Sequence, residues 1–179
     1  RLSQEQGTTV KDWGGRIPIA LVYPNSYYLG MSNLGVQTIY AFINSDDRFV
    51  CERVFWETPG MRHVGRVPLP PVSLESQRPL TDFPILAFSV SYELDYFQVV
   101  DTLRLAGLPL RSADRDESHP IVIAGGPAVT ANPEPLSPFL DAFVLGEGEA
   151  VLPSLIAVLG EMAEAPSVSG GLAAISGLA

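Results

Sequence analysis

The chain contains few of the residues from which disulfides, metal centres and nucleic-acid-binding surfaces are built. Its 179 residues include one cysteine, Cys51, and two histidines. A single thiol excludes a disulfide framework, and it excludes any iron–sulfur or zinc site with several cysteine ligands within this chain. The formal net charge is −9, Lys11 is the only lysine, and the arginines are scattered. Phosphate backbones are bound by basic patches, so this charge balance argues against nucleic acid as a partner.

Long hydrophobic runs are also missing. No apolar stretch approaches the ~20 residues that cross a bilayer, and no signal-peptide pattern opens the sequence. We therefore expect no membrane partner and a cytoplasmic location. The hydrophobic fraction of 46% and the charged fraction of 17% are those of an ordinary globular domain. Cys51 lies inside the apolar run Phe49–Phe55, which favours a buried, inert thiol.

Short apolar runs alternate with amphipathic segments along most of the chain. Helical spacing of apolar residues predicts helices over residues 36–43, 96–106 and 152–159, and Gly107 follows the second helix as a helix-ending glycine. Strands that alternate with helices pair in parallel through right-handed crossovers, so the pattern predicts an α/β fold. The five predicted strands are Ile17–Tyr23, Phe49–Phe55, Pro84–Ser91, Pro120–Ala124 and Asp141–Leu145.

The remaining segments divide the chain. Residues 1–15 form an N-terminal extension whose first ten residues are polar and are expected to fray. Residues 57–84 are rich in proline and glycine and predict an irregular connection. Residues 165–179 contain no charge and consist mostly of small residues, which is typical of a linker. We therefore expect one domain over residues 16–164 and a linker toward a further, downstream domain.

Several predicted strands break directly into glycine and polar residues. The fourth strand runs into Gly125 and Gly126, and the fifth is followed by Gly146 and Gly148. Glycine removes the Cβ atoms that would hold the backbone away from a bulky ligand, and open α/β sheets bind ligands at the carboxyl ends of their strands. These glycines therefore indicate the edge of the predicted sheet at which a ligand is expected to bind.

Four motifs follow one another along the chain: Tyr23-Pro-Asn-Ser-Tyr-Tyr-Leu-Gly-Met-Ser-Asn-Leu-Gly35, Phe88-Ser-Val-Ser-Tyr-Glu-Leu-Asp-Tyr96, Ala124-Gly-Gly-Pro-Ala-Val-Thr-Ala-Asn-Pro-Glu-Pro135 and Gly146-Glu-Gly-Glu149. Together they are similar to the N-terminal cobalamin-binding-like domain of radical SAM proteins with a B12-binding domain, in an uncharacterised subgroup. The resemblance covers the chain from about Trp13 to about Met162, and it implies a three-layer sandwich with a five-stranded, mostly parallel sheet in the order 2-1-3-4-5, as in flavodoxin-like domains.

The resemblance also implies what lies outside this chain. In such proteins a downstream barrel carries three cysteines that hold a [4Fe-4S] cluster and S-adenosylmethionine. One cysteine cannot supply that motif, so the cluster and S-adenosylmethionine are expected in the parent protein only, and the barrel is the expected partner. The chain by itself is not expected to be catalytic, and no catalytic residue or metal ligand is assigned.

The chain departs from the best-known cobalamin domains at one point. Those domains carry Asp-x-His-x-x-Gly after the first strand, and the histidine is the lower ligand of cobalt. Here the corresponding loop is Asn25-Ser-Tyr-Tyr-Leu-Gly30, without histidine, and neither asparagine nor tyrosine replaces imidazole well. Two alternatives follow: cobalamin bound without a histidine ligand, or loss of cofactor binding.

The strand ends and the resemblance together nominate a set of cofactor-binding residues. Structural roles compete at several of them: Gly125 and Gly126 also suit a tight turn with positive φ, and Ser89 and Ser91 also suit a helix cap. The set is Asn25, Tyr27, Tyr28, Ser89, Ser91, Gly125, Gly126, Pro127, Glu134, Gly146, Glu147 and Gly148.

Other polar and aromatic residues near the strand ends have more ordinary interpretations. Glu93 and Asp95 begin the second helix, where carboxylates favour capping. Tyr27 and Tyr28, with Met31, suit packing on a planar macrocycle, on another domain or on their own core. His63 falls in the irregular segment and His119 precedes the fourth strand, at the opposite edge of the sheet, so neither is expected to be a ligand or a base.

The sequence leaves three hypotheses for the function. The first is an accessory domain of a radical SAM enzyme that presents cobalamin or covers the active site of the barrel. The second is a cofactor-free docking module of the same fold. The third, an independent small-molecule or nucleotide-binding protein, lacks a phosphate-binding loop and a Gly-x-Gly-x-x-Gly motif after the first strand.

Overall fold

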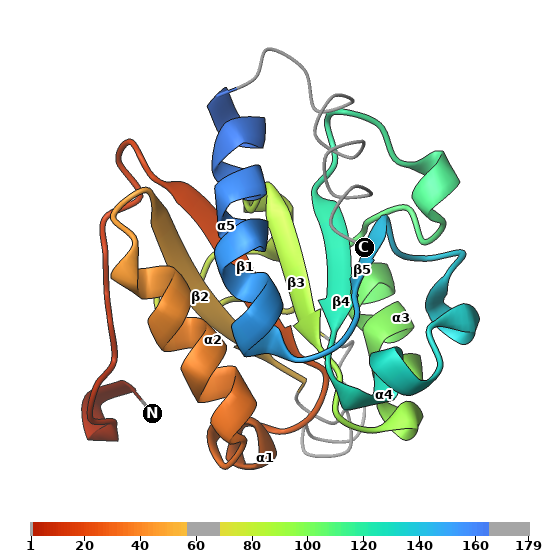
Figure 1. Cartoon of the computed structure of the whole chain (residues 1–179), viewed down its shortest axis with the longest axis horizontal. Coiled ribbons are helices and arrows are strands. Elements are labelled where there is room, and N and C mark those ends of the chain that lie inside the picture. Colours follow the sequence, from red (N-terminus) through yellow and green to blue (C-terminus); the bar gives the residue numbers. More distant parts are fainter. Residues whose placement is uncertain (1, 57–68, 165–179) are drawn as a thin grey trace.

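The computed structural model describes residues 2–56 and 69–164, which form an α/β sandwich around one sheet (Figure 1). The sheet has five strands, all parallel, in the order β2-β1-β3-β4-β5. The α/β class and the strand order predicted from the sequence are confirmed, and the sheet is wholly rather than mostly parallel. The strands are β1 (Ile17–Tyr23), β2 (Phe49–Phe55), β3 (Ile85–Ser89), β4 (Ile121–Gly125) and β5 (Ala142–Val144).

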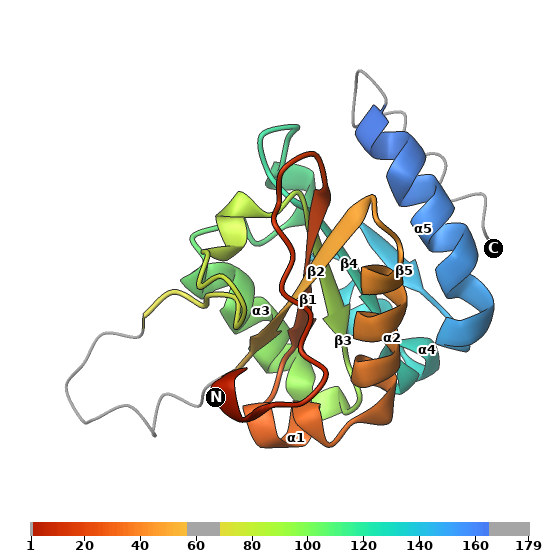
Figure 2. The ribbon, with the colours of Figure 1, turned by 90° about the vertical axis from the view of Figure 1, so that its left-hand side faces the viewer.

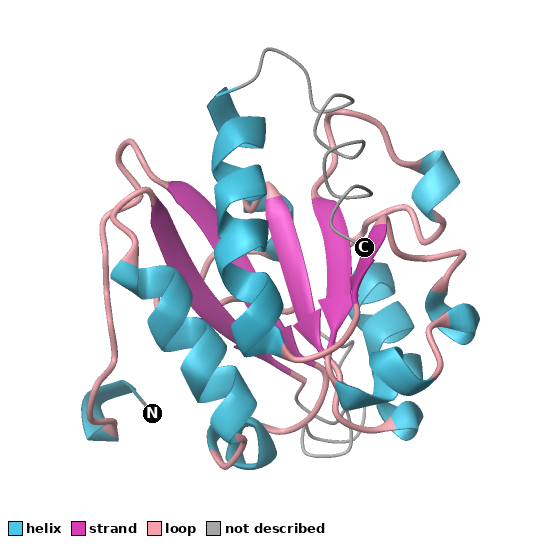
Figure 3. Ribbon diagram, in the orientation of Figure 1, coloured by secondary structure: helices cyan, strands magenta, loops and turns pink. Residues whose placement is uncertain are grey.

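Helices cover both faces of this sheet (Figures 2 and 3). On one face α2 (Leu34–Ser45) and α5 (Gly148–Glu164) pack over β1, β3 and β4, and on the other face lie α3 (Tyr96–Leu105) and α4 (Pro127–Ala131). These include the three predicted helices. Two short helices, α1 (Tyr27–Met31) and α4, lie where only loops were expected.

Local capping explains both short helices. The Ser26 side chain accepts a hydrogen bond from the Leu29 N–H and so begins α1, while Pro127 at the start of α4 has the φ that a first helical turn needs. Neither helix is long enough to show an apolar stripe, which is why periodicity missed them. The described residues also contain short 3₁₀ turns at Leu2–Gln4, Leu80–Asp82, Glu93–Asp95, Ser112–Asp114 and Glu134–Leu136.

The core has two halves, one on each face of the sheet. Along β1, Ile19 and Leu21 point toward α2 and α5, whereas Ala20 and Val22 point toward α3. Each fully buried aliphatic side chain contributes roughly 1.5–3 kcal/mol relative to an exposed one, so these two layers hold the helices to the sheet. Cys51 is fully buried, as expected, and burial raises the pKa of its thiol well above the ordinary range.

The N-terminal extension packs against the rest of the domain, and the expectation that the first ten residues fray is wrong for residues 2–10. Lys11 Nζ donates to the carbonyl oxygens of Asn44 and Asp46, and Thr9 exchanges two hydrogen bonds with the Tyr40 hydroxyl. These polar residues are ordered because they form hydrogen bonds with the buried residues Tyr40 and Asn44 of α2. Within residues 2–56 and 69–164, no helix is long and apolar enough to cross a membrane.

The predicted irregular connection is only partly described. Residues 69–84 form an isolated antiparallel bridge between Val72 and Pro79 and the 3₁₀ turn Leu80–Asp82, in keeping with the prediction. His63 lies outside the described residues. His119 precedes β4 at the amino edge, as predicted, with its Nδ1 2.8 Å from an Asp116 carboxylate oxygen.

Candidate functional site

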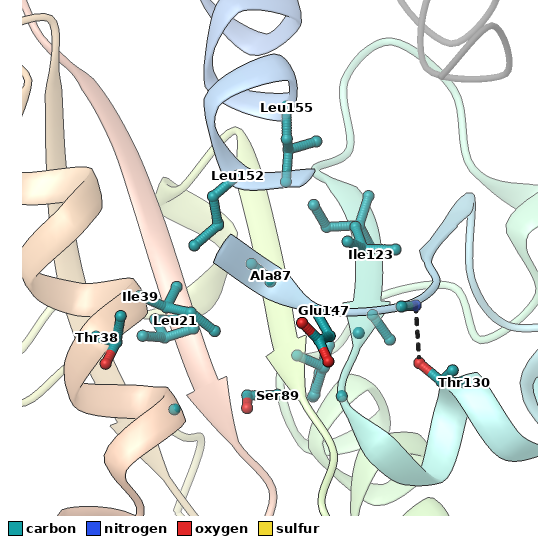
Figure 4. Close-up of a pocket in the computed structure, with 18 of the residues that line it drawn as sticks. Leu21, Thr38, Ile39, Ala87, Ser89, Ile123, Thr130, Glu147, Leu152 and Leu155 are labelled. Atoms are coloured by element: carbon teal, nitrogen blue, oxygen red, sulfur yellow. Dashed lines mark hydrogen bonds between the residues drawn. The ribbon is translucent and has the colours of Figure 1, made fainter. Parts of the chain in front are cut away.

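A cavity of about 660 Å³ lies between α2, α5 and the sheet, and it opens at the carboxyl ends of the strands (Figure 4). Leu152 and Leu155 of α5 form one wall and Ile39 of α2 faces them from the other side. The lining is mostly apolar, which favours a ligand, or a part of one, that is itself apolar. Its aliphatic residues are Ile19, Leu21, Ile39, Ile43, Ile123, Val144, Leu152, Leu155, Ile156 and Leu159.

Small side chains in the central strands create the space. Ala87 of β3 pairs with Leu21 of β1 and with Ile123 of β4, so one short side chain stands between two branched ones. One step further along the same face, Ser89 pairs with Gly125. The cavity is therefore deepest over β3, where short side chains leave space that the side chains of α2 and α5 do not fill.

Most of the nominated cofactor-binding residues line this cavity or its mouth. They come from three chain segments that meet where β3, β4 and β5 end. The residues brought together are Ser89, Ser91, Gly125, Gly126, Pro127, Gly146, Glu147 and Gly148.

Hydroxyl groups supply the polar part of the lining. Asn33 donates from Nδ2 to Ser91 Oγ at 3.0 Å, so the Ser91 proton is free to bond elsewhere. Thr130 Oγ1 likewise accepts from the Gly146 N–H at 3.1 Å, as the dashed line in Figure 4 marks. Ser89 Oγ makes no hydrogen bond to any described residue. The mouth therefore offers hydrogen-bond donors to a ligand that carries neutral or acceptor oxygens.

The same lining contains no lysine, arginine or histidine among the described residues. Glu147, at the mouth, is its one charged residue, and it is exposed. An apolar chamber without a cation is a poor receptor for a triphosphate or a free mononucleotide. Nucleotide binding, one form of the third function considered from the sequence, therefore gains no support.

The paired glycines have structural duties as well. Gly126 has φ +110°, and a Cβ there would lie 2.5 Å from the Val90 carbonyl oxygen. A Cβ on Gly125 would lie 3.1 Å from the Val144 carbonyl oxygen. The positive-φ turn expected for the pair is therefore present at Gly126 only, and close packing accounts for Gly125.

Four nominated residues do not reach the cavity. Both polar atoms of the Asn25 amide bond within the domain, because Nδ2 donates to Asp95 Oδ1 at 2.8 Å and Oδ1 accepts from the Ser26 N–H. Tyr28 is 74% exposed on α1, and Glu134 is exposed at the start of a 3₁₀ turn. None of these three, nor Tyr27, contributes to the lining.

Tyr27 occupies the position of the missing histidine but is turned away from the mouth. Its hydroxyl donates to Glu5 Oε1 at 2.6 Å, and its ring packs edge-on against Phe55 with the centroids 5.3 Å apart. Met31 also points inward, with its sulfur 3.1 Å from an Arg53 nitrogen. Of the two tyrosines, only Tyr28 remains exposed enough to pack on a macrocycle or on another domain.

The capping expected after β3 is not found. Ser91 bonds to Asn33, and Asp95, although it stands at the N-cap of α3, makes no capping hydrogen bond. Its carboxyl group is buried instead, and burial raises the pKa of Asp95, opposed in part by the hydrogen bond from Asn25.

Sequence reasoning missed the contributions of the helices to the site. Asn33 and Thr38 on the α2 side and Thr130 on α4 were not nominated, and neither were the α5 leucines. Asn33 carried a usable signal, because asparagine before an apolar-periodic segment is a common N-cap and so lies beside a strand end. In the described part of the chain, no group of three or more His, Cys, Asp or Glu residues could hold a metal ion.

The fold and the site together define a doubly wound α/β domain with an apolar ligand cavity at the carboxyl edge of its sheet. The chain belongs to the family of N-terminal domains of radical SAM proteins, whose sequence profile matches residues 35–174. It is 27% identical over 131 residues to the uncharacterised protein MJ0966 of Methanocaldococcus jannaschii. That alignment covers 73% of this chain but 24% of MJ0966, so the chain spans about a quarter of that relative's length. No solved structure shows a significant match.

Proposed function

We propose that this domain serves a radical SAM enzyme by holding cobalamin at the carboxyl edge of the sheet, with the nucleotide tail of the cofactor in the cavity between α2 and α5. The observation that carries the proposal is the apolar chamber of about 660 Å³ that opens at the strand ends. The tail of cobalamin ends in an apolar bicyclic base, which suits walls made of leucine and isoleucine.

The polar groups at the mouth fit the rest of the tail. Ser89 and Ser91 have donor capacity for ribose and amide oxygens, since neither hydroxyl proton is used by a described neighbour. Gly35 and Gly148, in the first turns of α2 and α5, belong to the lining, and free backbone N–H groups at helix starts favour a phosphodiester. The residues present therefore fit the group without a basic side chain.

No residue of the lining supplies an axial ligand to cobalt. The lining contains no imidazole, and Tyr27 is engaged by Glu5 and Phe55. The proposed mode is therefore binding without a histidine ligand and with the base detached from cobalt. Bound cobalamin would supply a carrier for methyl groups or for electrons to the parent enzyme.

The parent enzyme itself is part of the proposal. We place the [4Fe-4S] cluster and S-adenosylmethionine on a barrel domain downstream of residues 165–179 in the same polypeptide, with those residues as the linker. The family match and the quarter-length overlap with MJ0966 support this arrangement. The domain would position the cofactor and exclude water from it, while the radical chemistry would begin on the barrel.

A cofactor-free docking module remains the second candidate. The engaged Tyr27 favours it, because the one side chain at the position of the usual ligand is committed to the fold. The two candidates differ in a single measurable property, which is saturable binding of cobalamin.

Titration of the purified chain with hydroxocobalamin, followed by visible absorption and calorimetry, tests the proposal. We expect saturable binding with the spectrum of base-off cobalamin. Ala87→Phe, which fills the floor of the cavity, should weaken binding by at least about tenfold, and Ser89→Ala by about three- to tenfold for one lost hydrogen bond. Ala41→Phe on the exposed side of α2 is the matched control and should bind as the wild type does.

Each outcome assigns a function. No binding to the chain or to the complete gene product would favour the docking module. Binding that survives Ala87→Phe in a folded protein would place the cofactor elsewhere and would overturn the cavity as its site.

A further inference from the structure

Large hydrophobic side chains are exposed mainly at one edge of the molecule. Seven of the eleven such residues in the described part of the chain follow the carboxyl ends of strands, where α1 and the loops gather in Figure 1. Soluble domains seldom leave so many aromatic and aliphatic side chains in water on one edge without a partner. We define the apolar rim as Tyr28, Leu29, Leu34, Tyr92, Leu94, Phe97 and Leu145, which are 49–80% exposed.

The apolar rim surrounds the mouth of the cavity. Leu34 stands between Asn33 and Gly35, Tyr92 follows Ser91, and Leu145 precedes Gly146, and each of these neighbours belongs to the lining. A partner seated on the rim therefore lies across the opening through which a ligand enters.

In the described loops at this edge, the charged residues are all acidic. The described loops that follow β1, β3, β4 and β5 (residues 24–33, 90–95, 126–135 and 145–147) contain no lysine, arginine or histidine. Glu93, Glu134 and Glu147 are exposed in them. The matching surface has an apolar centre and arginine or lysine around it, because complementary charges favour association and like charges oppose it.

We propose that the apolar rim is the docking face for the downstream domain of the same polypeptide, and that docking closes the mouth of the cavity. This inference rests on the proposed function in one respect, namely that the chain is one domain of a longer radical SAM protein. The occupant is chosen because the family is defined as the N-terminal part of such proteins and because about three quarters of MJ0966 lies outside the aligned region. Closure couples the two events, so a ligand in the cavity leaves more slowly when the rim is covered.

Hydrogen–deuterium exchange on the complete gene product tests the inference. Residues 27–34 and 92–97 should exchange at least about tenfold more slowly in the wild type than in the double variant Leu94→Glu/Phe97→Glu. Val10→Glu/Phe42→Glu, which places the same charges on exposed apolar residues outside the rim, is the control and should leave those rates unchanged.

A second variant guards against misfolding. Leu34→Glu places a carboxylate on an 80% exposed residue at the start of α2, where the helix dipole favours it, so the fold tolerates the change. It should release the same segments. Equal exchange in the wild type and in both rim variants would overturn the proposal. Protection that depends on protein concentration would also overturn it, because it would indicate that a second copy of the chain covers the rim. So would a complete gene product that has no further domain.

Cobalamin titration of the same samples separates this inference from the proposed function. A protected rim without cobalamin binding supports docking and rejects the cofactor. Cobalamin binding with an unprotected rim rejects docking alone.

Discussion

Gly126 and Gly146 both adopt positive φ, at +110° and +95°, but their surroundings differ. A Cβ on Gly126 would lie 2.5 Å from a backbone oxygen, whereas a Cβ on Gly146 would meet no atom within 4 Å. We expect Gly146→Ala to lower the free energy of unfolding by about 1–2 kcal/mol through backbone strain alone. Gly126→Ala adds a collision with a backbone atom that has no rotamer to change, so it should cost about 2 kcal/mol more. Urea denaturation of both variants measures the difference, and equal losses would contradict the packing argument.

Asp95 is one residue whose titration should change stability with pH. It is 2% exposed, and its Oδ2 has no hydrogen-bond partner. Burial raises the pKa of Asp95, against the hydrogen bond from Asn25, so the folded protein keeps this proton to a higher pH than the unfolded chain. Its contribution to stability is therefore complete below the unfolded pKa and is lost as the pH rises through the raised folded pKa.

Asp95→Asn removes this loss of stability. Relative to the wild type, the variant should gain stability as the pH rises through that window, reaching about 1 kcal/mol at neutral pH, because a buried charge with an unpaired oxygen is replaced by a neutral amide. Urea denaturation at a series of pH values checks this, with exposed Asp47→Asn as the control for net charge. A difference that does not change with pH would mean that Asp95 does not titrate in this window.

Side-chain direction is the property of single residues that the sequence did not reveal. Tyr27 and Tyr28 are adjacent and chemically alike, yet one packs on Phe55 while the other faces water. The orientation of Tyr27 depends on Glu5, which is distant in sequence and accepts a hydrogen bond from the Tyr27 hydroxyl. Local patterns contain no information about such a partner.

At the scale of elements, β2 is an edge strand of the sheet, and other segments of the same chain cover its outer side. Arg53 of β2 is fully buried between Glu5 and Glu75, with nitrogen–oxygen distances of 2.7 Å to each carboxylate, and its guanidinium stacks on the Tyr40 ring. Its outward backbone groups bond to Leu74 and to the Glu75 carboxylate. Unpaired edges invite pairing with other chains, so these contacts protect the sheet while fixing the N-terminal extension.

This cluster gives a prediction about stability. Arg53→Met leaves two buried carboxylates without a cation and should lower the free energy of unfolding by about 3–5 kcal/mol. Glu5→Gln/Arg53→Met/Glu75→Gln removes the charges together and should recover most of that loss. Arg104→Met, at an exposed pair with Asp101, should cost less than about 1 kcal/mol. If the triple variant is as unstable as the single one, packing rather than charge is the cause.

The elements themselves were largely predictable, and the exceptions share a cause. Strands of a parallel sheet are mostly apolar, so all five were found, although β2 contains Glu52 and Arg53 and β5 is only partly buried. Arg53 lies within the β2 segment, so no pattern in the sequence indicated its ion pair with Glu5, which is one of the contacts that order the N-terminal extension. At the site, residues that follow strands were found because strand ends share an edge, whereas Thr38 and the α5 leucines lie on helices whose rotation over the sheet is set by packing.

At the scale of the whole molecule, the cavity joins ligand binding to folding. Its walls come from α2, α5 and four strands, so a ligand there contacts both helices of one layer at once. A ligand that binds only the folded state raises the free energy of unfolding by RT ln(1 + [L]/Kd), which is about 2.7 kcal/mol at a hundredfold excess over Kd. We therefore expect hydroxocobalamin to raise the denaturation midpoint by the amount that its measured affinity dictates.

The size of that shift distinguishes the cavity from any other binding surface. Ala87→Phe fills the floor of the cavity, and overpacking should lower the free energy of unfolding of the apoprotein by no more than about 3 kcal/mol. Because the variant should bind at least about tenfold more weakly, a hundredfold excess of cofactor over the wild-type Kd should stabilise it by no more than about 1.4 kcal/mol. Ala41→Phe should respond as the wild type does. Thermal or urea denaturation with and without cofactor supplies all of these values. If the cofactor stabilises Ala87→Phe as much as the wild type, the layer between α2 and α5 is not where it binds.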